Sequence, residues 1–166
     1  MKTKRSVGIL LTLFVVLVLS VTSVMAASPH FINASASIDN AGSLIVSWKE
    51  AGLGNNQLID YLASADATGF YACINGGGKH PQAANKEAFD GPVTQPGEFN
   101  SGKNGQITAD LTVDPPPSTL DCPNGQRHVL ACVTYTGIQL EDITNGIIAP
   151  VPGDLSKTFF AIPECP

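Results

Sequence analysis

A glycine-rich stretch, YACINGGGKHP, runs from Tyr71 to Pro81 and combines residue types that could do chemistry. Glycines ahead of a lysine can cradle a phosphate when they lead into a helix and a serine or threonine follows the lysine. Here His80 and Pro81 follow Lys79, so the hydroxyl is missing and the glycine spacing does not fit. We interpret the stretch as a loop after a strand, with Lys79 and His80 as candidate binding residues.

Nucleophilic catalysis requires a nucleophile, a base and an orienting acid within reach of one another. The candidate bases are His30, His80 and His128, and none lies in a motif typical of a serine or cysteine nucleophile. The sequence therefore marks no catalytic residue of this kind.

Paired carboxylates, as in glycosidases, are a second route to catalysis. Four acidic residues fall within predicted strands, where alternation predicts that they face solvent: Asp60, Asp110, Glu141 and Asp142. Glu141 and Asp142 lie close to Asn145, but the ligand spacing of a calcium loop is absent. We predict neither a metal nor a cofactor.

Aromatic side chains can also bind ligands, although those in strands usually pack in the core. Phe89 and Phe99 lie within the long segment from Gly76 to Gly105, outside the clearest strand candidates. We therefore add both to Lys79 and His80 as candidate binding residues.

The N-terminus has the pattern of a secretory signal peptide. Three basic residues precede an uncharged apolar run from Val7 to about Val21, and Val24 and Ala26 supply the small residues of a cleavage site. The run is shorter than the ~20 residues of a membrane-spanning helix. We predict that residues 1–26 are a signal peptide, and that residues 27–166 form a single secreted domain without a membrane anchor.

The charge of the mature chain excludes one class of partner. Cleavage would remove three of the nine basic residues and none of the fourteen acidic ones, which leaves a formal charge of −8. Nucleic-acid binding depends on clustered Lys and Arg, and this chain has no such cluster. We therefore expect an extracellular ligand or protein as partner, and no nucleic acid.

The four cysteines, Cys73, Cys122, Cys132 and Cys165, predict two disulfides, because secreted proteins meet an oxidising compartment. Three pairings are possible. We favour Cys73 with Cys122, which ties two loop-bordering positions, and Cys132 with Cys165, which pins the C-terminus to a strand. The spacing contains no Cys-x-x-Cys pair of the kind found in zinc sites.

Period-two alternation dominates the mature sequence. FINASASI predicts a strand with Ile32, Ala34, Ala36 and Ile38 on one face, and SLIVSW and QITADLTV predict buried faces in the same way. Further predicted strands are Leu58–Ala63, Gly69–Ile74, Pro92–Asn100, His128–Thr136, Ile138–Thr144 and Lys157–Ile162. PQAANKEAF, from Pro81 to Phe89, predicts the one short helix.

About eight short strands separated by turn residues predict an all-β antiparallel sandwich of immunoglobulin-like architecture, with at most one short helix. Tyr71 to Cys73 and Trp48 match parts of the immunoglobulin pattern. An immunoglobulin domain also needs a cysteine ahead of its tryptophan, and the mature chain has none before Cys73. The architecture therefore stands without the immunoglobulin assignment.

Four stretches resemble a group of small secreted bacterial proteins: SWKEAGLGNNQLIDYLASADAT, YACINGGGKHPQAANKE, SGKNGQITADLTV and DCPNGQ. The resemblance covers nearly all of the mature region. It implies a compact secreted β domain, and it implies no activity or catalytic residue, because the group has none assigned.

The leading functional hypothesis is a secreted, non-catalytic binding domain whose loops, from Asn75 to Gly105 and from Asp114 to Asn124, contact a ligand or protein. One alternative is a small extracellular hydrolase that uses carboxylates. Another is an inhibitor of a secreted protease, with the segment from Pro115 to Asn124 as its reactive loop.

Overall fold

The chain consists of strands and their connections in the part that the structure describes. The computed structural model describes residues 28–75 and 85–165. Within these ranges it has eight strands and no helix, so it contains no helix that could cross a membrane. The strands are β1 (His30–Ile38), β2 (Leu44–Ala51), β3 (Leu58–Asn75), β4 (Lys86–Asn100), β5 (Gln106–Val113), β6 (Gln126–Asp142), β7 (Ile147–Pro150) and β8 (Leu155–Thr158).

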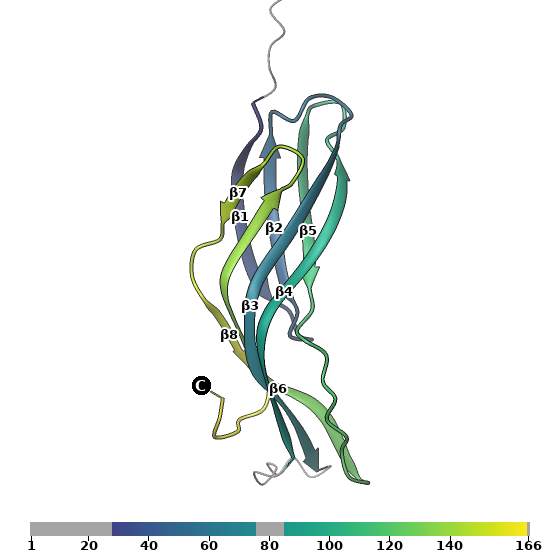
Figure 1. Cartoon of the computed structure of the whole chain (residues 1–166), viewed down its shortest axis with the longest axis vertical. Coiled ribbons are helices and arrows are strands. Elements are labelled where there is room, and N and C mark those ends of the chain that lie inside the picture. Colours follow the sequence, from purple (N-terminus) through teal and green to yellow (C-terminus); the bar gives the residue numbers. More distant parts are fainter. Residues whose placement is uncertain (1–27, 76–84, 166) are drawn as a thin grey trace, which may run out of the picture.

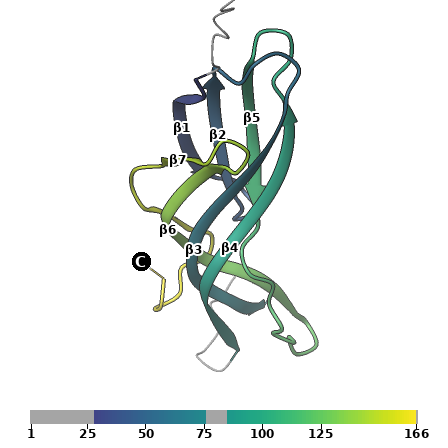
Figure 2. The ribbon, with the colours of Figure 1, turned by 45° about the horizontal axis from the view of Figure 1, so that its top comes forward.

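Two antiparallel sheets make up the fold. Sheet A has the strand order β1-β2-β5, and sheet B has the order β4-β3-β6-β7, with β8 paired to another part of β6. Figure 2 shows the strands of sheet B running obliquely to those of sheet A. The predicted antiparallel sandwich of about eight strands is confirmed.

The core between the sheets follows the period-two pattern of the sequence. Leu44, Val46 and Trp48 on β2 are buried, as predicted. Sheet A adds Ile107, Leu111 and Val113 from β5, and sheet B contributes Tyr61, Ala63, Ala65, Ala67, Val133, Tyr135, Ile138 and Leu140.

Ile32 departs from the predicted alternation. The sequence places Ile32 on the buried face of its strand, but its side chain is 51% exposed, and Phe31 packs against the core instead. The pairing of β1 with β2 shifts register between Phe31 and Asn33. A bulge of this kind changes the phase of the strand, so the neighbouring residue faces inward.

Gly137 joins two predicted strands into one. The pattern predicts separate strands, His128–Thr136 and Ile138–Thr144, whereas β6 continues through both. Gly137 has a φ of 59°, which favours glycine, and the pairing with β3 changes register opposite this point. A glycine bulge therefore bends the strand without ending it.

The helix predicted from Pro81 to Phe89 is wrong where the structure describes it. Residues 86–89 form the first part of β4, where Lys86 pairs with Ala72 and Phe89 with Gly69. Residues 81–84 lie outside the described ranges. A helical pattern this short is only a weak preference, and pairing with a neighbouring strand overrides it.

The strands of sheet B are longer than those of sheet A. β3, β6 and β4 contain 18, 17 and 15 residues, whereas β1, β2 and β5 contain 9, 8 and 8. Figure 1 shows β3 and β6 extending past the lower ends of β1, β2 and β5. We call this part of sheet B, residues 69–75, 86–90 and 126–132, the extension; both of its faces must be covered by something other than sheet A.

The segment between β5 and β6 covers one face of the extension. This segment, residues 114–125, is called the β5–β6 loop here. Tyr71 and Cys73 share a face of β3 because side chains alternate along a strand. Tyr71 donates a hydrogen bond to the carbonyl of Pro116, and Cys73 forms a disulfide with Cys122.

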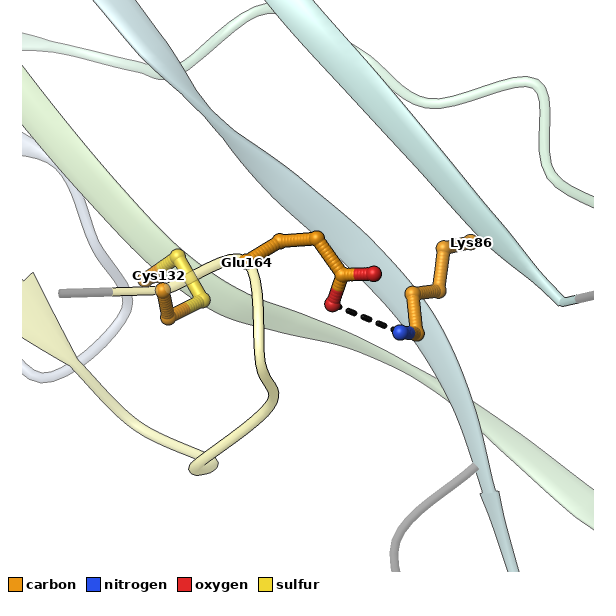
Figure 3. A network of polar contacts seen from close by, with 4 residues as sticks. Lys86, Cys132 and Glu164 are labelled. Atoms are coloured by element: carbon orange, nitrogen blue, oxygen red, sulfur yellow. Dashed lines mark hydrogen bonds and ion pairs between the residues drawn. A yellow bond between two sulfur atoms is a disulfide. The ribbon is translucent and has the colours of Figure 1, made fainter. Parts of the chain in front are cut away.

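The C-terminal segment, residues 159–165, covers the opposite face. Ala72 and Ala131 form a small cluster with Ile162, against which Phe70 and Phe160 pack. Next to it, Cys132 on β6 is bonded to Cys165. The Lys86 Nζ and Glu164 Oε2 atoms form an ion pair of 2.6 Å beside this disulfide (Figure 3).

Both favoured disulfide pairings are confirmed, and no free cysteine remains. Neither bond connects sheet A with sheet B, in contrast to the inter-sheet disulfide of immunoglobulin domains. Each instead holds a segment without regular structure onto the extension.

Removing either disulfide should destabilise the domain more than removing the adjacent ion pair. The pairs C73A/C122A and C132A/C165A should each lower the free energy of unfolding by roughly 2–4 kcal/mol, because each bond restricts the unfolded chain. E164Q should have a smaller effect, because the Glu164 side chain is partly exposed and its amide oxygen can still accept a hydrogen bond from Lys86. Urea denaturation measures all three, and a disulfide variant as stable as E164Q would contradict the expectation.

Candidate functional site

The β5–β6 loop is the most extensively anchored irregular segment of the described chain. Glu87, near the start of β4, accepts hydrogen bonds from three consecutive loop residues. Thr119 Oγ1 lies 2.7 Å from Glu87 Oε1, and the N–H groups of Thr119 and Leu120 lie 2.9 Å from Oε2. Ser118 Oγ also donates to Oε2. Together with Tyr71 and the Cys73–Cys122 bond, these contacts fix the loop from Pro116 to Cys122.

These hydrogen bonds stabilise the ionised form of Glu87. The bond from Ser118, followed by that from Thr119, lowers the pKa of the Glu87 carboxyl. Glu87 is therefore a carboxylate under ordinary conditions, and acts as an acceptor for the loop.

Ser118, His128 and Glu87 are the residue types of a catalytic triad in a different arrangement. In a triad the acid contacts the histidine, and the histidine accepts the serine proton. Here Ser118 donates its proton to Glu87, so His128 Nε2, 2.9 Å from Ser118 Oγ, must be the donor to that oxygen. Ser118 Oγ also accepts from the N–H of Leu120. The hydroxyl is thus fully used in holding the loop, and His128 stacks on Tyr71 with ring centroids 5.0 Å apart.

A second polar cluster lies inside the sandwich and was missed by the sequence analysis. Glu50 and Asp142 are both completely buried. Tyr61 Oη donates a 2.7 Å hydrogen bond to Glu50 Oε2, and Glu50 Oε1 has no hydrogen-bond partner. Asp142 was predicted to face solvent, which is wrong: its side chain accepts two hydrogen bonds from Asn145 at the β6–β7 turn.

The Glu50 carboxyl is protonated more readily than an ordinary glutamate. Burial raises its pKa to about 7, against the hydrogen bond from Tyr61, which lowers it; the nearby charge of Asp142 also raises it. Loss of the proton would leave a negative charge on a buried carboxyl group whose Oε1 has no hydrogen-bond partner.

The other carboxylates do not form a catalytic pair across a cleft. Asp60 and Asp110 are exposed, as predicted, and Glu141 is half-buried. Asp60 lies directly opposite Glu98 in the β3–β4 pairing, on a sheet face. Among the described residues no three His, Cys, Asp or Glu side chains are grouped so that they could hold a metal ion.

The structure separates the four predicted binding residues. Lys79 and His80 lie outside the described residues. Phe89 is half-buried and packs beside Tyr71, with centroids 5.4 Å apart. Phe99 packs edge-on against Trp48 at 5.1 Å, so most of its ring serves the core.

The sequence contains a signal for the position of Glu50 but none for the contacts of Glu87. Glu50 continues the buried series Leu44, Val46 and Trp48 at the next alternate position, so strict alternation predicts its burial. Glu87 lies in the segment that favours a helix, and its loop partners are 31 to 33 residues away. No local pattern predicts that contact.

Ionisation of Glu50 should destabilise the fold as pH rises. Its pKa in the folded state is about 7, above the ordinary 4.5, so the folded chain holds a proton that the unfolded chain releases. The free energy of unfolding should therefore fall between about pH 5 and 7, by at most about 1.4 kcal/mol per pH unit. His30 and Asp142 are the other ionisable groups that act electrostatically on Glu50.

E50Q should remove this part of the pH dependence, because the neutral amide does not titrate and its oxygen can still accept the hydrogen bond from Tyr61. Urea denaturation at several pH values measures it, with D110N on the exposed surface of sheet A as the control. Parallel stability curves for the wild type and E50Q would contradict the assignment.

No family model matches the chain, and neither a curated protein nor a solved structure matches it.

Proposed function

We propose that the protein is a secreted, non-catalytic binding domain that presents the β5–β6 loop to its partner. The observation that supports this is the fixation of the loop by Glu87, Tyr71 and the Cys73–Cys122 disulfide. A loop already held in one conformation loses less entropy on binding than a flexible one. The anchoring groups point from the sheet to the loop and leave its other side to solvent.

The exposed side of the loop offers several kinds of contact. Its most exposed residues are Asp114, Pro117, Thr119, Asp121, Pro123, Asn124 and Gly125. Pro115, Pro116 and Pro117 have no N–H group, so this part cannot donate to a strand and stays extended. The loop thus suits recognition through side chains and carbonyl groups.

The anchoring also argues for binding over hydrolysis. Ser118 is held as a structural hydrogen-bonding group, and the Glu50–Asp142 pair has no access to a substrate because both side chains are completely buried. A glycosidase needs its two carboxyl groups on either side of an open cleft. Asp60 and Glu98, which border a shallow hollow, lie side by side on adjacent strands of one sheet and not on two facing walls.

Protease inhibition is a second candidate, favoured by the same loop. An inhibitor needs an exposed segment held rigidly, which the Cys122 disulfide and the Glu87 contacts supply. The N–H groups of Thr119 and Leu120 are used by Glu87, so a protease would meet the side from Asp121 to Asn124. Titration against a panel of secreted proteases distinguishes inhibition from binding alone.

Secretion is part of the proposal and has its own support. Two disulfides fit an oxidising compartment, and the N-terminal residues have the signal-peptide pattern. We expect the protein in the culture medium to begin at Ala27, as measured by mass spectrometry of the intact chain. A protein that keeps residues 1–26 would contradict this.

A binding screen of the mature protein against glycans, polymers and secreted proteins tests the function. Any ligand should bind E87Q and D121N about tenfold more weakly, as expected for groups at or directly behind a contact. D110N, which removes an exposed carboxylate on sheet A away from the loop, should bind like the wild type. Hydrogen exchange should show that E87Q loses protection at the amides of Thr119 and Leu120, which confirms a loosened loop.

A screen without a ligand, or a ligand that E87Q and D121N bind as tightly as the wild type, would contradict the proposal. If E87Q and D121N bind the ligand more weakly and the wild type also hydrolyses it, the result would instead favour the hydrolase.

A further inference from the structure

The outer face of sheet B carries an exposed apolar surface at the end opposite the extension. Of the four large apolar side chains that are more than half exposed in the described chain, three lie here: Leu58 at 60%, Ile143 at 51% and Ile148 at 56%. Exposed apolar side chains that gather in one place mark interaction surfaces, whereas single ones do not.

Strand pairing shows that these side chains are neighbours. Ile148 on β7 lies opposite Glu141 on β6, and Glu141 lies opposite Leu62 on β3. In the next row, the N–H of Ile143 donates to the carbonyl of Asp60, which places the two residues side by side. Opposite residues share a sheet face, so the apolar side chains form one surface.

Three carboxylates lie among the apolar side chains. Asp60 is directly opposite Glu98, and Glu141 is one row away, beside Leu62. The only ion pair among the described residues is Lys86 with Glu164, in the extension, so none of the three is neutralised. We call the surface formed by Leu58, Ile143, Ile148, Asp60, Glu98 and Glu141 the Ile143 face.

The Ile143 face is also hollowed. A shallow depression of about 390 Å³ is lined by Asp60, Tyr61, Pro96, Gly97, Glu98 and Ile143. Gly97 has no side chain there, and the two carboxylates border the hollow together with Ile143 and Pro96. An inserted apolar group with a cation beside it would meet both kinds of surface.

The two opposed carboxylates weaken the sheet. Like charges directly opposite each other on neighbouring strands are destabilising, and the side chains of Asp60 and Glu98 make no hydrogen bond or ion pair with other described residues. A cationic group of a partner, placed between the two carboxylates, would remove this repulsion.

We infer that the Ile143 face binds a basic, partly apolar protein surface, with Lys or Arg side chains on Asp60, Glu98 and Glu141 and apolar side chains on Ile143 and Ile148. A second copy of this acidic chain, an anionic membrane and a nucleic acid would all be repelled by the carboxylates. The inference does not depend on the β5–β6 loop, which lies on the extension.

Three short synthetic peptides test the chemistry: one with lysines beside a leucine face, one with the leucines replaced by serine, and one with the lysines replaced by glutamate. Fluorescence anisotropy with the mature protein should show binding of the lysine–leucine peptide that weakens with added salt. The other two should bind at least about tenfold more weakly, because one lacks the apolar side chains and the other lacks the basic side chains.

Matched variants locate the contact. I143S/I148S and D60N/E98Q should each weaken binding of the lysine–leucine peptide about tenfold. I32S removes an isoleucine of the same 51% exposure from sheet A, and D110N removes an exposed sheet A carboxylate, so both should bind like the wild type. E87Q should also bind normally, which separates this surface from the loop. Urea denaturation confirms that each variant is folded.

Three results would overturn the inference. If the peptide with serines in place of leucines binds as tightly as the lysine–leucine peptide, the protein attracts cations without using the apolar side chains. Equal weakening by I32S or D110N would place the contact elsewhere. Sedimentation that shows a dimer dissociated by I143S/I148S would identify the face as a contact between two copies of the chain.

Discussion

The structure depends on a difference in strand length between its two sheets. A sandwich is stable where two sheets cover each other, and here the three long strands of sheet B continue well past the short strands of sheet A. The extension would expose apolar side chains such as Phe70 and Ala72 on one face and Tyr71 on the other. Two irregular segments therefore have to take the place of a third layer, and each is held by a disulfide.

This constraint explains where the candidate binding loop lies. The β5–β6 loop must reach from the end of sheet A to the start of β6 at the end of the extension (Figure 1). It therefore passes along the face of the extension that carries Tyr71 and Cys73. An irregular segment has backbone groups that need partners, and Glu87 satisfies the N–H groups of Thr119 and Leu120. The rigidity that makes the loop suitable for recognition follows from the requirement to cover the sheet.

The parts of the fold that alternation and cysteine chemistry determine could be predicted from the sequence. The strand class, the buried faces of β2 and β5 and both disulfides belong to this part. Local bulges could not, because Ile32 and Gly137 change phase through pairing with another strand. The Glu87 contacts could not be predicted either, because they join residues more than 30 positions apart and depend on β4 being a strand. Asp142 was assigned to solvent because adjacent acidic residues conceal which one faces inward.

The two ends of the molecule are stabilised by different interactions, which respond differently to pH. The end near Glu50 is held by aromatic packing of Trp48, Tyr61 and Phe99 around a buried carboxyl, so protonation affects it. The extension is held by covalent bonds and by an ionised Glu87 that stays charged across the same pH range. A change of pH that weakens the sandwich therefore leaves the loop contacts intact. Recognition at the loop can persist under conditions that alter the stability of the core.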